Sequence, residues 1–305
     1  MKKCVMIVNP ESGKRKRKYS FQDVYDVLRK YCYDTEIFFT KCAGDALRIV
    51  KNLDDSIDLV ISAGGDGTLH EVVTGNMQRK KKITVAPLPL GSTNDVGKMY
   101  GLNKGYIENL EKILTGQKKL VDICYINNSP FVYVACFGDY TDMAYSTPRK
   151  LKKRYGKIAY IMYGLRQLRN RIRNYNIKYE IDGKQYNGCF SFMFITNSSR
   201  IAGQSFIYND VKLNDKMFEV AFANVKTKKE MLKLLVLIST MNIKDVPGIT
   251  YYQTDNLIIE FLDSPKSSWC IDGEEYKANL SRYEFSLEQN MYMLVPKEKI
   301  DVLFE

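Results

Sequence analysis

Glycine and aspartate follow an apolar stretch in the sequence IDLVISAGGDGTLHEVV, residues 57–73. The run 59–61 is typical of a buried strand, and the residues after Thr68 have the spacing of a helix. Glycines at such a junction allow backbone N–H groups to approach a phosphate closely, and the helix N-terminus favours negative charge. Asp66 would repel a phosphate, but it suits a Mg²⁺ ion held between the two groups. The alternative is a tight turn in which Asp66 caps the helix.

Two more polar loops follow apolar runs. The sequence PLPLGSTND (87–95) supplies hydroxyls, an amide and an acid before a helix, and NPESG (9–13) follows the first apolar run. A simple helix cap by Ser92, Thr93 or Asn94 is the alternative for the former loop. Because ligands of open parallel sheets bind beyond the carboxyl ends of the strands, three such loops at one edge predict a phosphate site.

The elements that must position these loops alternate between strand and helix over residues 1–125. Such alternation predicts an α/β fold, a Rossmann-like parallel sheet with helices on both faces. The expected strands are 4–8, 35–40, 59–61 and 83–88, and the expected helices are 21–28, 45–53 and 69–77.

Residues 126–305 have mostly the pattern of strands, which predicts a β-rich, sandwich-like or barrel-like second domain. A return of the last strand to the first domain is compatible with this division. The expected strands are 131–137, 175–181, 189–196, 219–225, 256–261 and 269–271, and the expected helices are 155–172 and 228–240.

In order along the chain, NPESG, Thr40 in FFTKCAGDA, GGDGTLHEV and PLGSTND resemble the bacterial diacylglycerol kinase family, a group of lipid kinases related to sphingosine and ceramide kinases. GGDGT alone also fits NAD kinases and phosphofructokinase-like enzymes, so its combination with PLGSTND is the specific feature. The resemblance extends through most of the chain, more weakly after about residue 125. It implies a first domain that binds ATP and a β-rich lobe that helps to receive the lipid.

The resemblance also implies which residues contact ATP and its Mg²⁺. His70 departs from the family, which usually has asparagine there, whereas Glu71 matches it. The implied nucleotide-binding residues are Asn9, Pro10, Glu11, Ser12, Gly13, Thr40, Gly64, Gly65, Asp66, Gly67, Thr68, Leu69, His70, Glu71, Ser92, Thr93, Asn94 and Asp95.

A later motif, CIDGE (270–274), resembles the family segment whose glutamate acts as general base. Glu274 would take the proton of the lipid hydroxyl as it attacks the γ-phosphate, while Asp66 manages the metal ion. The alternative for Asp272-Gly273 is a hairpin turn, and a turn does not exclude a base beside it.

The segment LNDKMFE (213–219) resembles the family's L-x-D-G-x-L-D, which holds a structural magnesium ion. The resemblance implies ligation by the Asp215 carboxylate and by the carbonyls of Lys212 and Met217. Lys216 replaces the glycine and Glu219 replaces the later aspartate, which predicts weak binding of the ion or none. A surface β-turn is the alternative.

The amino-acid composition of the chain indicates where the protein acts and which partners it binds. No apolar stretch approaches the ~20 residues that span a bilayer, and seven scattered cysteines without a CxxC pair suit reduced thiols in the cytoplasm. The net charge of +11 favours anionic partners. A basic cluster at 149–154, followed by tyrosines and further arginines, suits peripheral docking to an anionic membrane, with a solvated basic face as the alternative. In the basic cluster at 14–18, some residues could face nucleotide phosphates, and most are expected to be solvated.

The leading hypothesis is an ATP- and Mg²⁺-dependent lipid kinase that converts diacylglycerol to phosphatidic acid. Other lipid acceptors remain open, namely a sphingoid base, phosphatidylglycerol or monoacylglycerol. The non-family alternatives are an NAD kinase, a nucleotide-binding regulator without turnover, and a basic nucleic-acid binder. No nucleic-acid partner is expected, because no RNA-binding signature is present. The oligomeric state is left open, a homodimer included.

Overall fold

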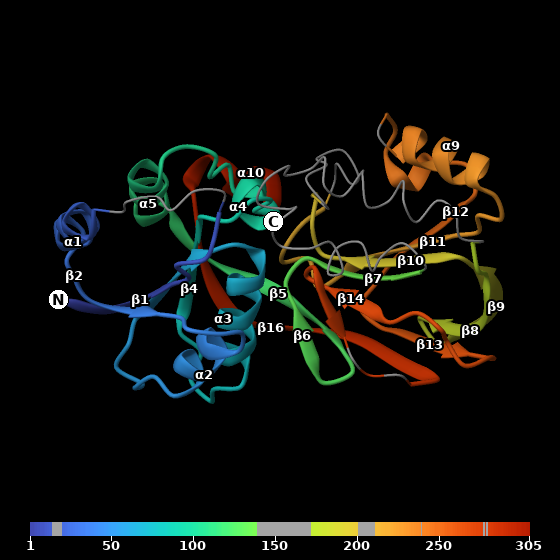
Figure 1. The fold of residues 1–305 in the computed structure, drawn as a ribbon, viewed down its shortest axis with the longest axis horizontal. Helices are drawn as coiled ribbons and strands as arrows, with labels where there is room; N and C mark the ends of the chain where they lie inside the picture. The colour runs from blue at the N-terminus through green and yellow to red at the C-terminus, as the bar shows by residue number, and fades with distance from the viewer. Residues whose placement is uncertain (14–19, 139–171, 201–210, 239, 277, 279) are drawn as a thin grey trace. The chain divides into compact units, whose positions relative to one another are not determined.

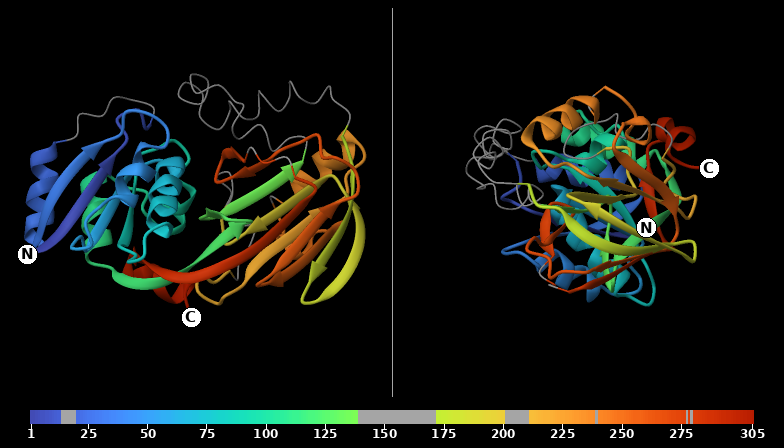
Figure 2. Two further views of the ribbon diagram at one scale, coloured as in Figure 1. Left: turned by 90° about the horizontal axis from the view of Figure 1, so that it is seen from below. Right: turned by 90° about the vertical axis from the view of Figure 1, so that its right-hand side faces the viewer.

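The computed structural model describes residues 1–13, 20–138, 172–200, 211–238, 240–276, 278 and 280–305. The chain forms two compact units (Figures 1 and 2). Unit 1 comprises Met1–Asp122, Lys212–Asp215 and Gln289–Glu305, and unit 2 comprises Ile123–Val211 and Lys216–Glu288. Within the described residues, no helix combines the length and apolar character needed to cross a membrane.

Unit 1 is built on a sheet of order β2-β1-β3-β4-β16, in which β1 to β4 run parallel. Helices α1 and α5 pack together on one face, and α2 and α3 pack together on the other (Figure 1). The elements are β1 (Lys2–Val8), α1 (Phe21–Lys30), β2 (Tyr33–Phe39), α2 (Asp45–Lys51), β3 (Leu59–Gly64), α3 (Asp66–Met77), β4 (Thr84–Pro89), α4 (Asp95–Met99), α5 (Tyr106–Leu114) and, at the chain end, η2 (Lys297–Lys299) and α10 (Ile300–Leu303).

Local sequence explains these elements. The central strand β3 is buried at every position, as expected for a strand covered on both faces. Helix α1 begins after Ser20, whose hydroxyl accepts from the backbone N–H of Asp23 at 3.2 Å, and it buries Val24 and Leu28 one turn apart. Arg29 and Lys30 lie in its last turn, where positive charge favours the helix dipole.

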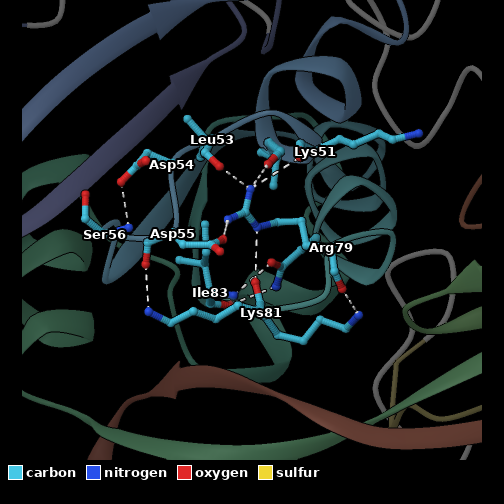
Figure 3. A network of polar contacts seen from close by, with 11 residues as sticks. Lys51, Leu53, Asp54, Asp55, Ser56, Arg79, Lys81 and Ile83 are labelled. Atoms are coloured by element: carbon cyan, nitrogen blue, oxygen red, sulfur yellow. Dashed lines mark hydrogen bonds and ion pairs between the residues drawn. The ribbon is translucent and has the colours of Figure 1, made fainter.

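Arg79, in the segment after α3, makes hydrogen bonds to the end of α2 (Figure 3). Its buried guanidinium donates to the carbonyls of Val50, Lys51 and Leu53 at 3.1, 3.3 and 2.5 Å, and to the Asp55 carboxylate at 2.7 Å. The last carbonyls of a helix lack partners within the helix, and Arg79 donates to those of Lys51 and Leu53 at this end. The Val50 carbonyl also accepts from the Leu53 N–H at 3.3 Å. This contact fixes α2 and α3 as one layer.

Unit 2 contains a six-stranded sheet of order β12-β11-β10-β7-β14-β15 and a second layer of order β16-β13-β8-β9. All strand pairs of these two layers are antiparallel. The elements are β5 (Gln117–Ile126, shared with unit 1), β6 (Ser129–Phe131), β7 (Val134–Gly138), β8 (Tyr175–Ile181), β9 (Lys184–Phe190), β10 (Phe192–Thr196), β11 (Phe218–Ala223), α9 (Lys228–Ile238), η1 (Ile243–Asp245), β12 (Ile249–Thr254), β13 (Leu257–Phe261), β14 (Trp269–Ile271), β15 (Glu274–Tyr276) and β16 (Arg282–Val295, shared with unit 1).

A largely aromatic core joins the two layers of unit 2. Trp269, Phe137 and Phe285 are fully buried, and the Trp269 ring lies 5.3 Å from Phe137 and 5.0 Å from Phe285, measured between centroids. Alternate residues of both layers point into this core, as in a β-sandwich. The predicted fold class, a parallel α/β sheet with a β-rich sandwich, is therefore confirmed.

Two expected strands are each two strands in the structure. The run 131–137 is interrupted at Val132 and Tyr133, because the Asp272 carboxylate takes their backbone N–H groups. The run 189–196 divides at buried Ser191, where the chain leaves the layer of β9 and enters that of β10. The expected helix 155–172 lies outside the described residues except for its last residue.

The sequence pattern predicted a helix after the PLPLGSTND loop, where α4 lies, but not its bounds, and it did not predict α5, β5, β12 or β16. Strand β16 pairs antiparallel with β13 through residues 282–285 and parallel with β4 at Met293, so it contributes to both units. The functional division into a nucleotide-binding domain 1–125 and a lipid-kinase domain 126–305 stays a prediction.

Candidate functional site

The loops that follow β1, β3 and β4 meet at the carboxyl edge of the parallel strands. The backbone N–H of Asn9 donates to the Ala63 carbonyl at 3.0 Å, and that of Leu90 donates to the Gly64 carbonyl at 2.7 Å. The Asn9 side-chain amide also donates to the Thr68 hydroxyl at 3.1 Å. The structure therefore brings the three predicted loops together, as the order of the strands required.

Glycines permit the close approach of these loops. A Cβ at Gly91 would lie 2.5 Å from the Gly65 Cα and 2.6 Å from the Asn94 Oδ1, distances that a side chain cannot occupy. Gly13 has a φ of +87°, and a Cβ there would lie 2.7 Å from the Leu90 carbonyl oxygen. The loops thus form a tight backbone layer beside the N-terminus of α3, the arrangement that suits a phosphate.

Asp66 is the first residue of α3, and Gly65 is its N-cap. The Asp66 carboxylate accepts from the backbone N–H of Val96 at 3.4 Å, in the first turn of α4. Asn94 is the N-cap residue of α4, but no side-chain cap bond forms there, and its amide donates to the Gly91 carbonyl at 2.9 Å. The alternative of a side-chain cap by Asn94 is wrong, since Asp66 occupies that role from the neighbouring loop.

A small pocket lies beneath the loops and contains two buried polar atoms. Among the described residues, the Ser62 hydroxyl and the Asn94 Oδ1 are buried there and have no hydrogen-bond partner in the chain. Because a buried polar group without a partner costs about 1–3 kcal/mol, both atoms favour a polar ligand or an ordered water. The pocket is lined by Ser62, Gly64, Gly65, Asp66, Leu69, Pro87, Leu88, Pro89, Asn94 and Gly97.

The site therefore suits a phosphate-bearing ligand. Its glycine layer leaves no room for side chains, the N-terminus of α3 is at its centre, and unpartnered polar atoms line it. Such a site holds an anion through backbone N–H groups, and Asp66 suits a divalent cation bound to that anion.

Glu71 and Asp45 hold the loop after β2. The Glu71 carboxylate accepts from the backbone N–H groups of Gly44 at 2.8 Å and Ala46 at 3.1 Å. It therefore provides acceptors for N–H groups at the start of α2 that have no partner within the helix. Hydrogen bonds from the Arg48 side chain and the Lys41 backbone lower the pKa of Asp45 to about 2. Thr40 is half-buried at the start of this loop, and its N–H donates to the Val8 carbonyl at 2.9 Å.

The remaining predicted nucleotide-binding residues lie around the same edge. Leu69 and Asp95 are buried. The backbone N–H groups of Glu11 and Ser12 donate to the side-chain and backbone oxygens of Asn9 at 3.0 and 3.1 Å, so Asn9 organises its own loop. Ser92, Pro10 and Glu11 are exposed, and Ser12, Gly67, His70 and Thr93 are half-buried.

In unit 2, Glu274 begins β15 and is exposed. The preceding Asp272 and Gly273 have φ of +50° and +88° and form a two-residue turn between β14 and β15, so the hairpin alternative is correct. Asp272 is 3% exposed, and its carboxylate accepts from the N–H groups of Val132, Tyr133 and Val134 at 2.7, 3.0 and 3.2 Å. A buried carboxylate thus fixes the turn beside Glu274.

The predicted metal segment 212–217 runs from unit 1 into unit 2. The Lys212 ammonium donates to the Asp301 and Phe304 carbonyls at 3.0 and 3.1 Å, and Met217 is 38% exposed. Lys216 has a φ of +59°, the left-handed conformation that a glycine adopts freely. Within the described residues, no group of three acidic, histidine or cysteine side chains could hold a metal, so Asp215 would depend on carbonyls and water as co-ligands.

Two residues of the site were missed as individual candidates. Ser62 was expected in the loop after the strand 59–61, whereas it lies within the fully buried strand β3, where a serine is itself a signal of a polar neighbour. Gly91 was noted in its motif, but its contact with Gly65 depends on a pairing of loops that spacing does not show. The basic cluster 149–154, proposed for membrane docking, and the basic cluster 14–18 lie outside the described residues.

Comparison with known proteins finds a similarity to diacylglycerol kinases. The family model described as the diacylglycerol kinase catalytic domain matches residues 3–126. The diacylglycerol kinase of Bacillus subtilis (strain 168) is 29% identical over 309 residues, covering 99% of each chain. That of Staphylococcus aureus (strain bovine RF122 / ET3-1) is 29% identical over 301 residues, covering 98% of this chain and 94% of its own.

A crystal structure of a diacylglycerol kinase from Bacillus anthracis str. Sterne is similar in fold, with a TM-score of 0.75, 19% identity and 98% coverage of both chains. This likeness includes both units and agrees with the fold class predicted from the sequence.

Proposed function

We propose that the chain is an ATP-dependent lipid kinase, because a model of the diacylglycerol kinase catalytic domain matches residues 3–126 and agrees with the motifs of the loops. The proposed reaction transfers the γ-phosphoryl group of ATP to the hydroxyl of diacylglycerol and gives phosphatidic acid. The observation that carries the proposal is the backbone contact of Gly65 with Gly91 beside the N-terminus of α3.

ATP would lie along the carboxyl edge of unit 1, and its triphosphate would contact the glycine layer. Asn9, through its bond to Thr68, holds the first loop against α3. Glu71 keeps the loop after β2 in place by satisfying the start of α2. These side chains support the site through other residues, and the backbone N–H groups of the loops would bind the phosphates.

Asp66 would hold the Mg²⁺ that accompanies ATP. A divalent ion neutralises charge on the phosphates during phosphoryl transfer. The bond from the Val96 N–H fixes one Asp66 oxygen, Oδ1, and so orients the carboxylate. This arrangement makes the acid a preorganised ligand, because its position is set by two helices that are joined at the site.

Glu274 would act as the general base for the lipid hydroxyl. A carboxylate can accept the proton as the hydroxyl oxygen attacks, and phosphoryl transfer needs little else from the protein beyond positioning and charge. The support is its place in the CIDGE motif and the rigid turn that Asp272 fixes. The ligands proposed for a structural Mg²⁺ are Asp215 and the carbonyls of Lys212 and Met217.

A diacylglycerol substrate lies in a bilayer, so we place the enzyme in the cytoplasm at the membrane surface. The net charge of +11 supports an anionic surface as its docking partner. The direct test is transfer of labelled phosphate from ATP with Mg²⁺ to lipids in mixed micelles. Diacylglycerol, monoacylglycerol, phosphatidylglycerol and a sphingoid base form the panel, with NAD as a soluble acceptor.

Labelled phosphatidic acid from diacylglycerol is the expected product. Labelling of NAD alone would indicate an NAD kinase, and labelling of another lipid would correct the substrate. ATP binding without any labelled product would favour a regulator without turnover, for which the departures at His70 and Lys216 are the motivation.

A further inference from the structure

Helix α9 has a basic and partly apolar face on the outside of unit 2. Its buried residues Met231 and Leu234 pack into an apolar core on the six-stranded sheet, beside which Figure 1 shows the helix. Lys229, Lys233 and Val236 follow one another at spacings of four and three residues, which places them on one face of the helix. All three are exposed, Val236 by 56%. This face is therefore directed away from the sheet.

Glu230 is the one acidic residue in the sequence of α9, and it is used at the start of the helix. The N–H of Glu230 donates to the Thr227 hydroxyl at 3.2 Å, and the Glu230 carboxylate accepts from the N–H of Lys226 at 2.9 Å. These two reciprocal bonds are those of a capping box. The carboxylate is thus held at the helix start, where it serves a backbone group and not the lysine side chains.

The lysines of α9 keep their charge available to another molecule. Elsewhere in the chain lysines form ion pairs, such as that of Lys112 with Glu298 at 2.6 Å. Among the described residues, no ion pair includes Lys228, Lys229 or Lys233, and all three are exposed. Uncompensated positive charge on a surface attracts an anionic partner.

Exposed apolar side chains lie at the other end of α9. The Thr240 hydroxyl donates to the carbonyls of Val236 and Leu237 at 3.1 and 3.2 Å, and the N–H of Met241 donates to the Leu237 carbonyl at 2.9 Å. These bonds hold Met241, which is 37% exposed, against the last turn of the helix. Val236 and Met241 therefore add apolar surface beside the lysines.

This combination suits the surface of an anionic bilayer better than a nucleic acid. Lysine ammonium groups bind lipid phosphates and carboxylates, while their methylene stems and neighbouring apolar side chains enter the boundary between headgroups and acyl chains. Nucleic acids also attract lysines, but their bases stack on aromatic side chains. The sequence of α9, KKEMLKLLVLI, contains no aromatic residue.

We propose that α9 is a membrane-docking surface, on which Lys229 and Lys233 bind anionic phospholipid headgroups and Val236 enters the interface between them. The partner is a bilayer that contains anionic phospholipid. The purpose of docking, access to a lipid substrate, rests on the proposed function, whereas the binding itself needs neither ATP nor turnover. The surface is separate in sequence from the basic cluster 149–154.

The experiment measures co-sedimentation of the full-length protein, without ATP, with vesicles of phosphatidylcholine alone or of phosphatidylcholine with phosphatidylserine. The test variant is Lys229→Ala with Lys233→Ala. The control is Lys178→Ala with Lys184→Ala, which removes the same charge from exposed positions of β8 and β9 in the other layer of unit 2.

The apolar contribution is tested by Val236→Gln, with Leu262→Gln as its control, because Leu262 is 53% exposed. A further variant, Val236→Trp, reports insertion directly. The natural chain has one tryptophan, Trp269, which is fully buried, so a new signal comes from position 236. Its fluorescence should shift to shorter wavelength on vesicles with phosphatidylserine and should be quenched by brominated acyl chains.

Binding to vesicles that contain phosphatidylserine, and much weaker binding to phosphatidylcholine alone, is the expected result for the wild type. Each lysine near an anionic surface strengthens binding about fivefold, so the Lys229 and Lys233 double variant should bind about 25-fold more weakly. Val236→Gln should bind about fivefold more weakly, and both controls should bind like the wild type.

Four results would overturn the proposal. They are wild-type protein that does not bind the anionic vesicles, equal binding by the wild type and the lysine double variant, an equal loss in the Lys178 and Lys184 control, and an unshifted fluorescence of Val236→Trp in the presence of vesicles. Loss of binding only when the cluster 149–154 is replaced would place docking there instead.

A kinase assay separates this proposal from the proposed function. The α9 variants should phosphorylate a water-dispersed short-chain diacylglycerol at the wild-type rate and long-chain diacylglycerol in anionic vesicles more slowly. A wild type that binds vesicles through α9 but phosphorylates neither lipid would contradict the proposed function and leave the docking surface in place. Equal slowing of both reactions in the α9 variants would show that α9 does not act through docking.

Discussion

Gly65 and Gly91 come from loops after two neighbouring strands, and their backbones touch. A Cβ on Gly91 would lie 2.5 Å from the Gly65 Cα, whereas one on Gly65 would lie 3.4 Å from the Gly91 Cα. The contact therefore depends mainly on Gly91. Because it joins the GGDGT and PLGSTND loops, it should set the shape of the proposed phosphate site.

Replacement Gly91→Ala should weaken ATP binding by at least about 10-fold, since the added carbon must push the two loops apart and displace groups that position the ligand. Isothermal titration with ATP and Mg²⁺ measures the dissociation constant. Gly105→Ala is the matched control, because a Cβ there meets nothing within 4 Å. Equal ATP affinity in the Gly91→Ala variant and the wild type would contradict the assignment.

Replacement Asp66→Asn should separate the two roles of this residue. Asparagine keeps an oxygen that can accept from the Val96 N–H, but it loses the charge that a Mg²⁺ ion requires. Turnover should fall by about 100-fold or more, with little change in the unfolding temperature. The variant Asp66→Ala should in addition lose about 1 kcal/mol of stability, as expected for a lost helix cap. An Asp66→Asn enzyme of normal turnover would refute the metal role.

Replacement Arg79→Lys should lower the free energy of unfolding by about 3 kcal/mol. A single ammonium cannot donate to all of the carbonyls that accept hydrogen bonds from the guanidinium. Urea denaturation measures the change. The same substitution at exposed Arg29, in the last turn of α1, is the control and should change stability by less than about 0.5 kcal/mol. Equal effects at the two positions would mean that the network in Figure 3 contributes little.

Replacement Lys216→Gly should give a protein more stable than Lys216→Ala by about 1 kcal/mol, because alanine keeps the Cβ that is strained at a φ of +59°. Both variants remove the ammonium beside Asp215, so their comparison isolates the backbone effect. Thermal unfolding followed by circular dichroism provides the measurement. A more stable alanine variant would show that the turn does not carry this strain.

The sequence predicted that β1, β3 and β4 run parallel and that their loops meet, because both follow from local patterns and from the rule that strand ends share an edge. It could not predict that the Asp66 carboxylate accepts the Val96 N–H at the start of α4, since that hydrogen bond joins residues 30 apart in the chain. The interruption between β6 and β7 could not be predicted from the sequence for the same reason. Its cause is Asp272, about 140 residues away.

Strand β16 shows another limit of local patterns. Its alternation of exposed and buried residues changes along its length, because residues 282–285 pair with β13 and Met293 pairs with β4. One period therefore does not describe the strand. The hairpin at Asp272-Gly273, by contrast, was accessible, because two residues with positive φ suit aspartate and glycine.

The proposed mechanism depends on Glu274, and a neighbouring residue supplies its control. Glu274 and Glu275 are both exposed residues of β15, and adjacent residues of a strand point to opposite faces. The deciding measurement is the rate at which labelled γ-phosphate passes from ATP to diacylglycerol in the Glu274→Gln and Glu275→Gln variants. A loss of about 10²–10⁴-fold for Glu274→Gln, with unchanged ATP affinity and near-normal turnover for Glu275→Gln, is the predicted result. Equal rates in the wild type and Glu274→Gln would contradict it.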